Sequence, residues 1–479
     1  GAEGGEEANL WAGDLYRIEN ALGPYVTYAS YDADGRVTRI TDANGVNTDM
    51  TYTPRGWLAT RIVAGATTTF GYTPYGAVSS IVDPSGITTT FTYDAAHRLT
   101  DITDAQGNDI HYTLDAAGHK TADQTRNASG AVVRSLSRSY NAVGQLTAII
   151  DGLNHTVFNA GYSDSYDGNG NLVHSADALG FQRLQGFGAL NRLDSTIANY
   201  NGTDPATSNT QTAFDYDALN RLDGVDDPDG LDTVTTYDGL GDRTQLASPD
   251  TGTSTDAYDA AGNPLTHTDA KGVVSTSTYD ALNRRLSTSY TDSTLNVSYA
   301  YDETNGVTGC TSSKPKGRLT RIIEGGVTTV YCYSPRGKIL QKRQITGSQT
   351  DTTTYTYTVA DRLSKVTSPD NTVITYVYNS DGRPSSVKVT PSGTTTASPT
   401  VVSAITWLPF GPISSYKLGN GQQVTRTYDA NYALTDLGSP AFTLHLARDA
   451  VGDVVGIGNS VGADPATETY SYDPLYRLD

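Results

Sequence analysis

The chain has 479 residues, with 52 acidic against 33 basic side chains and a formal net charge of −19 at pH 7. This charge argues against a nucleic acid or an anionic membrane surface as the partner, because both would be repelled. Hydrophobic residues make up only 37% of the chain, and 32 Tyr beside a single Met favour β structure over helix. No run of about 18 apolar residues could form a transmembrane helix.

Residues 1–24 are predicted to be an N-terminal lead-in or cap. They contain no basic segment followed by an apolar one, so they carry no signal-peptide pattern. Residues 25–479 are predicted to form one continuous segment of about twenty repeats. The segment stops just after the first strand of a hairpin, so we expect a truncated piece of a longer ribbon.

The repeats are recognised by a register that recurs most often every 21 residues. The longer intervals contain insertions rich in Ser, Thr, Gly and Pro that fall between registers, as loops should. We number the repeats 1 to 20 by the first residue of each register: 31, 52, 72, 93, 114, 140, 166, 187, 216, 237, 258, 279, 301, 333, 357, 378, 407, 428, 448 and 472.

Three positions of the register define what we call the YD turn. The first position is Tyr in sixteen registers and the second is Asp in twelve. The fifth is Gly, Asn, Asp or His in all registers except those of Tyr432 and Tyr476, and these four residue types tolerate a positive φ. The residues that best represent the pattern are Tyr31, Asp32, Gly35, Tyr93, Asp94, Tyr216, Asp217, Asn220, Tyr237, Asp238, Tyr279, Asp280 and Asn283.

Each repeat is predicted to be a β-hairpin. A short run such as residues 98–102 follows the YD turn, and a second turn such as residues 105–108 follows that run. Leu99 and Ile102 are three positions apart, so the strand needs either a bulge or a run that is apolar on both faces. The sequence leaves both alternatives open.

Twenty hairpins give about forty strands, and at roughly 4.8 Å per strand the ribbon is on the order of 190 Å long. Closed into a single ring it would be about 60 Å across, which is too wide for side chains to fill. We therefore expect a spiral whose successive turns touch and protect each other's edges.

The repeats carry a family resemblance. Residues 216–222 (YDALNRL) and 279–286 (YDALNRRL) resemble the YD repeat of rearrangement-hotspot (Rhs) proteins, and the resemblance covers roughly residues 25–479. That family includes bacterial polymorphic toxins, type VI secretion effectors, insecticidal toxin-complex C components and the animal teneurins. Its members form a hollow β-shell of spiralling hairpins, which in bacterial members surrounds a C-terminal toxin. The resemblance implies that this chain is shell material.

The family's shells usually end in a core region with an Asp-Pro-x-Gly-x-x-Gly-Gly motif and aspartates that cut the toxin free. No segment of this sequence matches the motif: residues 473–478 belong to another register, and Asp464-Pro465 lacks the glycines that should follow. We therefore place neither a toxin domain nor an autoprotease on this chain.

The repeated residues are expected to be structural. A Tyr ring can lie over the neighbouring hairpin while its hydroxyl reaches water or a backbone carbonyl, and the Asp can accept backbone amides of its own turn. The arginines that follow the turn could pair with turn carboxylates of adjacent repeats: Arg36, Arg98, Arg192, Arg221, Arg284, Arg318, Arg362, Arg383 and Arg477.

Metal and catalytic sites are weakly supported. Residues 167–171 (DGNGN) resemble the start of a calcium loop, but Leu172 stands where Gly is needed and Ala178 where Glu is needed. The acidic turn with Asp226, Asp227, Asp229 and Asp232 is a second, weak candidate for a divalent cation. The seven His residues (His97, His111, His119, His155, His174, His267 and His445) show no ligand spacing.

Cys310 and Cys332 are the only cysteines; Cys310 lies within an insertion at residues 306–317 in the longest inter-register interval, and Cys332 lies beyond it. A disulfide between them would anchor the insertion and suit an exported protein. Two free buried thiols are the alternative. Similar Cys pairs occur in repeats of the Rhs family, so the resemblance favours the disulfide.

The sequence thus predicts an all-β fold of repeated hairpins, coiled into a spiral, hollow shell or part of one. We expect it to enclose a C-terminal toxin or other polypeptide cargo for delivery, with secretion-apparatus or cap proteins as further partners. We expect no enzymatic activity and no cofactor, and export from a bacterium or display on its surface.

Two other functions stay open. One is a teneurin-like extracellular adhesive protein, and the other is a carbohydrate-binding or lyase-type β-solenoid with exposed rows of aromatic rings. A packed centre would favour the solenoid, whereas a polar-lined hollow would favour enclosure.

Overall fold

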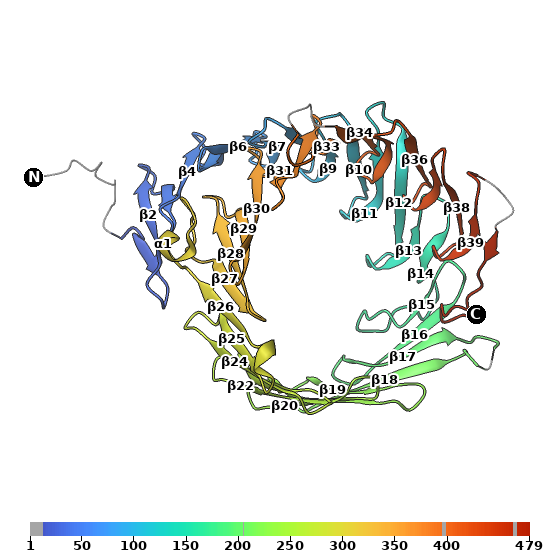
Figure 1. Cartoon of the computed structure of the whole chain (residues 1–479). Helices are drawn as coiled ribbons and strands as arrows, with labels where there is room; N and C mark the ends of the chain where they lie inside the picture. The colour runs from blue at the N-terminus through green and yellow to red at the C-terminus, as the bar shows by residue number, and fades with distance from the viewer. Residues whose placement is uncertain (1–12, 205, 395–398, 463–466) are drawn as a thin grey trace, which may run out of the picture. The chain divides into compact units, whose positions relative to one another are not determined.

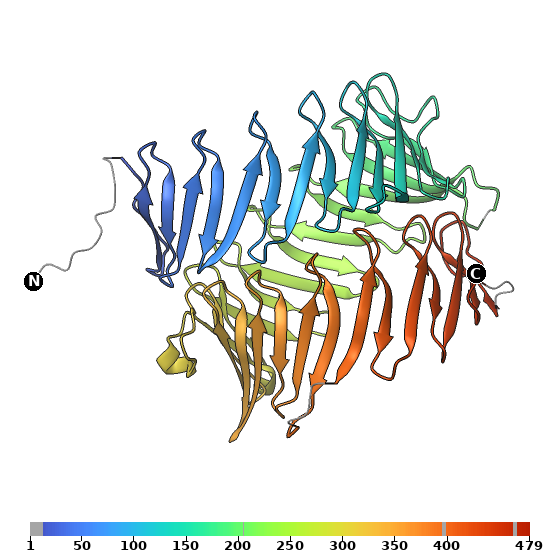
Figure 2. The ribbon, with the colours of Figure 1, turned by 90° about the horizontal axis from the view of Figure 1, so that it is seen from above.

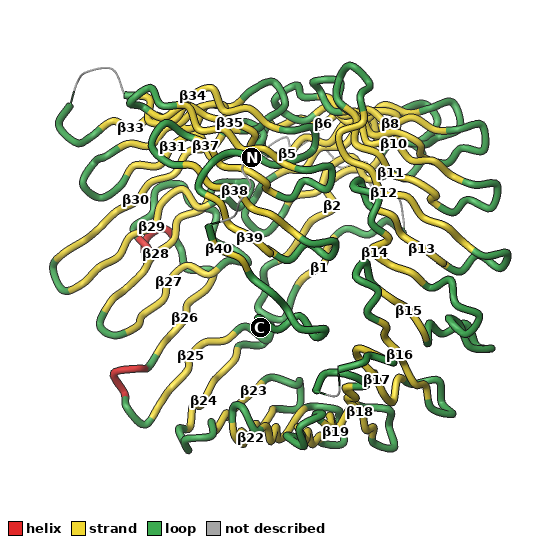
Figure 3. Tube along the Cα trace, turned by 90° about the vertical axis from the view of Figure 1, so that its right-hand side faces the viewer, coloured by secondary structure: helices red, strands yellow, loops and turns green. Residues whose placement is uncertain are grey.

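The computed structural model describes residues 13–204, 206–394, 399–462 and 467–479, and these are almost entirely strands and turns. Within these described ranges, helical residues are confined to two short segments, η1 (Ser293–Leu295) and α1 (Asn305–Thr308) (Figure 3). No helix in the described part of the chain is both long and apolar enough to cross a membrane. The fold is all-β, as the repeat pattern predicted.

The strands are β1 (Arg17–Glu19), β2 (Tyr25–Tyr31), β3 (Val37–Thr41), β4 (Asn47–Tyr52), β5 (Leu58–Val63), β6 (Ala66–Tyr72), β7 (Val78–Val82), β8 (Thr88–Tyr93), β9 (Leu99–Thr103), β10 (Asp109–Leu114), β11 (Lys120–Arg126), β12 (Val132–Tyr140), β13 (Leu146–Ile150), β14 (Thr156–Asn159), β15 (His174–Ala176), β16 (Gln182–Phe187), β17 (Leu193–Tyr200), β18 (Thr210–Tyr216), β19 (Leu222–Asp226) and β20 (Thr233–Tyr237). The chain continues with β21 (Arg243–Ser248), β22 (Gly252–Tyr258), β23 (Pro264–Thr268), β24 (Val274–Tyr279), β25 (Arg285–Tyr290), β26 (Val297–Tyr301), β27 (Leu319–Glu324), β28 (Val327–Tyr333), β29 (Ile339–Thr346), β30 (Gln349–Tyr357), β31 (Leu363–Thr367), β32 (Val373–Tyr378), β33 (Pro384–Thr390), β34 (Thr400–Trp407), β35 (Ile413–Leu418), β36 (Gln423–Tyr428), β37 (Leu434–Gly438), β38 (Thr443–Arg448), β39 (Val454–Gly458) and β40 (Glu468–Thr469) (Figure 1).

The chain divides into two compact units, each made of two separate stretches. Unit 1 contains Gly1–Thr90 and Thr255–Pro399, and unit 2 contains Phe91–Ser254 and Thr400–Asp479. Within a unit, each recorded ladder joins a strand antiparallel to the next strand of the chain, for example β4 to β5 in unit 1 and β10 to β11 in unit 2. We call the two stretches of a unit its first and second row of hairpins. Figure 2 shows the rows of unit 1 in blue and in gold to orange.

Because the strands run antiparallel in chain order, the two kinds of turn lie at opposite edges of every row. The YD turn joins the two strands at one edge, and the second turn leads into the next repeat at the other edge. Strands make extensive contacts only with the strands before and after them in the chain. Each row is therefore a ribbon one sheet thick.

The YD turn forms through backbone hydrogen bonds and a left-handed fifth residue. In repeat 1, the Asp32 amide donates to the Arg36 carbonyl (2.9 Å) and the Gly35 amide to the Asp32 carbonyl (3.0 Å), with Gly35 at φ +78°. His97, at φ +63°, shows the same conformation without glycine. Residues that tolerate a positive φ are thus needed here for a backbone reason.

The expectation that Tyr432 and Tyr476 fall outside this pattern is wrong. Both are left-handed, at φ +67° and +64°, and both hydroxyls have partners: Tyr432 donates to the Pro409 carbonyl (2.9 Å) and Tyr476 to the Asp177 carboxylate. These side-chain bonds offset the cost of a positive φ for a bulky residue. The sequence pattern fails instead at Asn305, which begins α1, and at Gly411, where the preceding Phe410 (φ +47°) is the left-handed residue.

The open question of strand alternation is answered by a regular β-bulge beside the YD turn. In repeat 6, Tyr140 pairs with Leu146 and Ser139 with Ala148, so Thr147 is an extra residue. The same shift stands in the other recorded YD hairpins, for example between Thr51 and Tyr52. The extra residue shifts the alternation of side chains by one position. Residues three positions apart, such as Leu146 and Ile149, therefore point to the same side of the sheet.

The described residues bury little apolar surface. Ten hydrophobic residues are buried, and a cluster of three of them, Cys310, Val330 and Cys332, packs with Ile345. The low hydrophobic content of the sequence is therefore explained by a fold without a thick core.

The predicted lead-in, residues 1–24, falls partly outside the described residues, since the structure does not describe residues 1–12. Within the described part, the strand β1 pairs antiparallel with β2, so the ribbon already begins at Arg17. Asp464-Pro465 of the missing Rhs core motif also lies outside the described residues.

Candidate functional site

The aspartate of each YD turn binds the backbone of its own turn. Asp32 Oδ1 accepts the amides of Asp34 (3.0 Å) and Arg36 (2.9 Å), while Oδ2 accepts the Arg36 guanidinium (2.7 Å). Asp280 and Arg284 repeat this geometry. The carboxylate therefore fixes the turn and the arginine that follows it.

The arginine column links consecutive repeats, but mostly without the carboxylate partners that we considered. Arg98 pairs with Asp94 of its own turn and donates to the Asp115 carbonyl of the next repeat (2.8 Å). Other guanidinium groups lie over the next register's tyrosine ring, as Arg36 does over Tyr52 (4.9 Å to the centroid). Arg284 does reach a carboxylate of the next repeat, Asp302, at 2.8 Å.

The register tyrosines bond to the ribbon itself. In thirteen registers the hydroxyl donates to a backbone carbonyl of the preceding repeat, as Tyr216 does to Leu193 (2.7 Å) and Tyr237 to Leu222 (2.8 Å), and in repeat 1 the Tyr31 hydroxyl donates to the Leu15 carbonyl ahead of the first register. A ring held by its hydroxyl and covered by a guanidinium offers little free face for stacking a sugar.

The opposite face of the sheet carries pairs of hydroxyl groups beside the YD turns. Thr51 and Thr60 lie 2.7 Å apart and Thr236 and Thr244 lie 3.0 Å apart, each pair across one hairpin. Since neighbouring positions on a strand point to opposite faces, the hydroxyl pairs stand behind the tyrosine rings. We call this side the hydroxyl face.

The two rows of unit 1 meet turn to turn. Asn44, in the second turn of repeat 1, donates to the Lys316 carbonyl (3.0 Å), while the Lys316 amide donates back to Asn44 Oδ1 (2.7 Å). Arg362, in the YD turn of repeat 15, pairs with Asp83 in the second turn of repeat 3 (2.6 Å). We call such a line of contacts the seam of the unit.

The seam of unit 2 uses the same two kinds of turn. Asn431, in the YD turn of repeat 18, donates to Asp151 Oδ2 (2.6 Å) and accepts the Gly152 amide (2.9 Å) in the second turn of repeat 6. The Tyr476 hydroxyl of repeat 20 donates to Asp177 in repeat 7. Three of the four seam contacts therefore join repeats twelve apart: 1 with 13, 3 with 15 and 6 with 18.

Gly152 shows how closely the two rows of unit 2 approach. A Cβ at this position would lie 2.5 Å from the Ala430 carbonyl oxygen. Real Cβ atoms do not approach backbone atoms so closely, so the seam requires glycine here.

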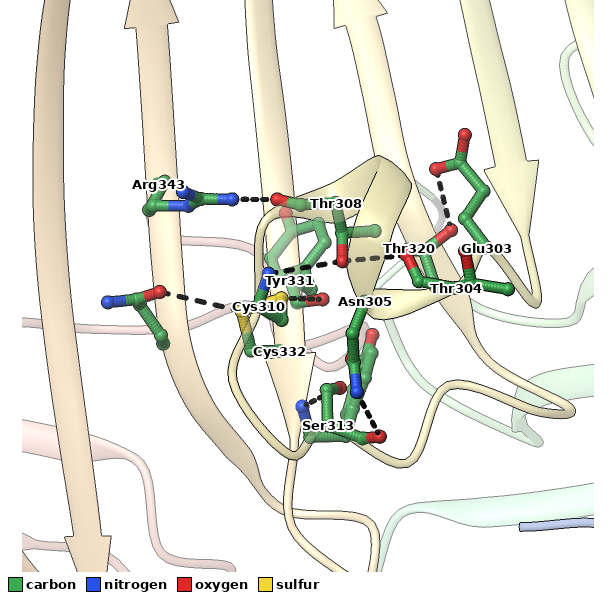
Figure 4. Close-up of a disulfide and its surroundings, with 12 residues drawn as sticks. Glu303, Thr304, Asn305, Thr308, Cys310, Ser313, Thr320, Tyr331, Cys332 and Arg343 are labelled. Carbon is green, nitrogen blue, oxygen red and sulfur yellow. Dashed lines mark hydrogen bonds between the residues drawn. A yellow bond between two sulfur atoms is a disulfide. The ribbon is translucent and has the colours of Figure 1, made fainter.

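The insertion of repeat 13 reaches the seam of unit 1 and is anchored by a disulfide. Cys310 and Cys332 are bonded to each other and lie 22 positions apart in sequence (Figure 4). The Arg343 guanidinium donates to the Thr308 carbonyl in α1, and the Ser313 hydroxyl accepts the Tyr333 amide at 2.8 Å. Lys314 and Lys316, just beyond, carry the contacts with Asn44.

The metal candidates of the sequence have other roles. Asp167 Oδ1 accepts the amides of Asn169 and Asn171 (both 2.9 Å), as in any YD turn. In the acidic turn, Asp227 accepts the Asp229 amide (2.7 Å).

A different group, Asp101, Asp109 and His111, places three potential ligand atoms within 4.8 Å in the described part of the chain. Arg126 lies 3.3 Å from Asp109 and 3.6 Å from Asp101, so its positive charge already offsets part of the negative charge of this group.

The histidines form a pattern that ligand spacing did not reveal. Six of the seven place Nδ1 near an aspartate: His111, His119, His155, His174, His267 and His445. Two of these pairs, Asp115 with His119 and Asp151 with His155, are four positions apart within one turn. The sequence signal that could have found them is Asp at the start of a turn and His where Arg usually stands.

Hydrogen bonds lower the pKa of the turn aspartates. For Asp94, the Arg98 amide is the strongest cause, followed by the Arg98 guanidinium, and together they outweigh burial. For Asp280 and for the seam residue Asp83, burial alone would raise the pKa, but the amides and the arginine bound to each carboxylate lower it overall.

Comparison with known proteins supports the repeat assignment. The RHS Repeat family model matches residues 31–69, 72–109, 93–132 and 258–295. No curated protein sequence matches the chain.

Solved structures share the fold over almost the whole chain. A crystal structure of TcdB2-TccC3 without its hypervariable C-terminal region matches 97% of this chain at 15% identity, with a TM-score of 0.71. A Photorhabdus luminescens Tc holotoxin pore matches 97% at 14% identity, with a TM-score of 0.62. The match spans 31% of each of those chains, so this chain is similar to about a third of their length.

The close approach at the unit 2 seam yields a first prediction. Gly152→Ala should push the Ala430 backbone away and weaken the seam by about 1–3 kcal/mol, the usual cost of overpacking. Hydrogen exchange followed by mass spectrometry should then be faster in both turns, residues 151–155 and 429–433. Gly239→Ala is the matched control, because a Cβ there meets nothing within 4 Å. Unchanged exchange in Gly152→Ala would show that the rows do not touch at this point.

A second prediction concerns the disulfide. Replacing Cys310 and Cys332 by Ala should cost about 3 kcal/mol of local stability, as expected for a closed loop of this length. The freed insertion should no longer hold Asn44, so residues 42–46 should exchange faster while residues 151–155 in unit 2 stay unchanged. Equal protection of residues 42–46 with and without the disulfide would refute the link.

A third prediction follows from the lowered aspartate pKa values. A carboxyl group with a lowered pKa in the folded state stabilises the fold above its unfolded pKa, near 3.9, and loses that contribution as pH falls through the folded value. The melting temperature should therefore change little from pH 7 to 5 and fall steeply below about pH 4. Asp280→Asn should lower the melting temperature at pH 7 and reduce its fall in acid. A steep fall already above pH 5 would contradict the assignment to aspartates.

Proposed function

Because this chain is an RHS-repeat protein, we propose that it forms part of the wall of a shell that encloses a polypeptide cargo. The observation that carries this proposal is the ribbon one sheet thick, whose rows join turn to turn within each unit. A chain of 479 residues whose described part buries so little apolar surface is suited to covering a large area.

The chemistry of the sheet supports a barrier role without catalysis. We infer that the hydroxyl face meets the cargo, since neutral hydroxyl groups already bonded to each other neither bind tightly nor repel a polypeptide. The repeated Tyr, Asp and Arg side chains are bound to the ribbon and are proposed to be structural, so we propose no enzymatic activity and no cofactor for this chain.

The cargo and the compartment are inferred from the family. We propose a toxic C-terminal domain as the cargo, because the matched TcdB2-TccC3 chain carries a hypervariable C-terminal region in its native form. Export from a bacterium agrees with the disulfide, which forms and persists in oxidising surroundings. Sugar binding is less well supported, because most register tyrosines are held by hydroxyl bonds and several, such as Tyr52 and Tyr237, are also covered by guanidinium groups.

A fusion experiment tests enclosure. A small nuclease reporter joined after Asp479 should be digested by protease more slowly while the chain is folded than after the chain is unfolded, because even part of a wall shields one side of the reporter. The same fusion carrying Gly152→Ala should protect the reporter less, since the seam of unit 2 is opened. A reporter that is digested as fast as the free nuclease would overturn the proposal.

A further inference from the structure

Four charged or titratable side chains of unit 2 gather on one face of three neighbouring strands. Asp101 of β9 is paired directly with His111 of β10, and Asp109 of β10 with Arg126 of β11. Asp109 and His111 are two positions apart on one strand, so both point to the same side of the sheet. Thr92 precedes a register tyrosine and so belongs to the hydroxyl face, and its hydroxyl donates to Asp101 Oδ2 (2.7 Å). We call these four residues on the hydroxyl face the aspartate-histidine cluster.

Polar atoms at the centre of this cluster make no hydrogen bonds to the described residues. Asp109 Oδ2 is buried and accepts none, and the buried Nε and Nη2 of Arg126 donate none. The two side chains approach each other to 3.3 Å, so their contact is ionic but poorly directed. Buried polar atoms of this kind are rare in folded proteins, and a bound ion or water molecule is a common reason for them.

Arg126 does not fully balance the two carboxylates of the cluster. Two ionised aspartates face one guanidinium, so one negative charge is left over while the histidine is neutral. Burial raises the pKa of Asp109; Arg126 lowers it and Asp101 raises it, and the pKa ends above its ordinary value. A further positive charge beside Asp109 would therefore be favourable.

The donor atoms of the cluster suit a transition-metal ion. One ligand atom from each of Asp101, Asp109 and His111 lies within 4.8 Å of the others, and His111 Nδ1 is 2.7 Å from Asp101 Oδ1. Ligand atoms of one tetrahedral Zn²⁺ ion lie about 3.4 Å apart, so small side-chain rotations would bring the three atoms into position. An imidazole with carboxylates suits Zn²⁺, whereas Mg²⁺ and Ca²⁺ prefer oxygen ligands alone.

Repeat 18 contains the same aspartate-histidine pair without the second carboxylate. His445 Nδ1 lies 2.8 Å from Asp436 Oδ1, and the two residues are paired directly across β37 and β38. Thr443 stands two positions before His445, where repeat 4 has Asp109. This pair offers two ligand side chains in place of three, so it is a matched control within the chain.

We propose that Asp101, Asp109 and His111 bind one Zn²⁺ ion, with water as the remaining ligand. His111 would bind through Nδ1 and keep its proton on Nε2. Arg126, whose side chain is 26% exposed, would turn away from the ion. The ion would tie β9 to β10 on the hydroxyl face. It is a structural ion, and we propose no reaction at this site.

Calorimetric titration of the full, metal-free chain with ZnCl₂ tests the proposal. The unmodified chain should bind one equivalent, and Zn²⁺ should raise its melting temperature, because the site exists only in the folded state. Asp109→Asn and His111→Ala should each weaken the affinity at least about tenfold, since each removes a ligand. His445→Ala should leave the affinity unchanged.

Arg126→Gln distinguishes loss of the site from loss of the fold. This substitution removes a positive charge next to the ion, so it should strengthen Zn²⁺ binding by about tenfold. A misfolded variant could not produce such a gain at the same stoichiometry.

The proposal is overturned if neither the unmodified chain nor Arg126→Gln binds Zn²⁺. It is also overturned if His111→Ala binds as tightly as the unmodified chain, or if His445→Ala weakens binding as much as His111→Ala does. Weaker binding by Arg126→Gln would likewise contradict it. Enclosure is measured on a fused reporter without added metal, so either proposal can fail while the other stands.

Discussion

An aspartate that accepts the backbone amides of its own turn is the interaction on which the rest of the structure depends. Asp32 does this in a YD turn, and Asp42 does the same in the second turn that follows, where it accepts the amides of Asn44 and Val46. Each bond is charge-assisted and satisfies an amide that the turn leaves unpaired. Repeated at both edges, it ends strands at regular intervals and accounts for much of the negative charge of the chain.

A ribbon built in this way is stabilised mainly by neighbours in sequence, because each strand packs only against the strands beside it. The seam adds the non-local contacts. It is short and polar, and it depends on turn shape. The Asn44 side-chain amide exchanges two hydrogen bonds with the Lys316 backbone, and Gly152 leaves room for the Ala430 carbonyl. Such a seam joins rows without a thick core, which is what a wall requires and a compact domain does not.

Much of the fold could be predicted from the sequence, because it is set by local patterns. The pattern of Tyr, Asp and a residue that tolerates a positive φ predicted each hairpin. The spacing of Leu99 and Ile102 left a bulge as one of two possibilities. What the sequence could not give was the pairing of distant turns. Nothing around Asp83 marks Arg362 as its partner, since seam partners are about 280 residues apart and share no motif. The left-handed conformation of Tyr476 could not be predicted for the same reason, because the hydrogen bond that compensates for it is made to a residue of another row.

The central claim is that rows meet through turns twelve repeats apart, and paired cysteines test it most directly. The chain has no free cysteine among its described residues, so an introduced pair can be followed alone. Asn44→Cys with Lys316→Cys should form a second disulfide in the folded protein, whereas Asn44→Cys with Arg336→Cys, displaced by one repeat, should not. A bond in the displaced pair, or in neither pair, would contradict the account.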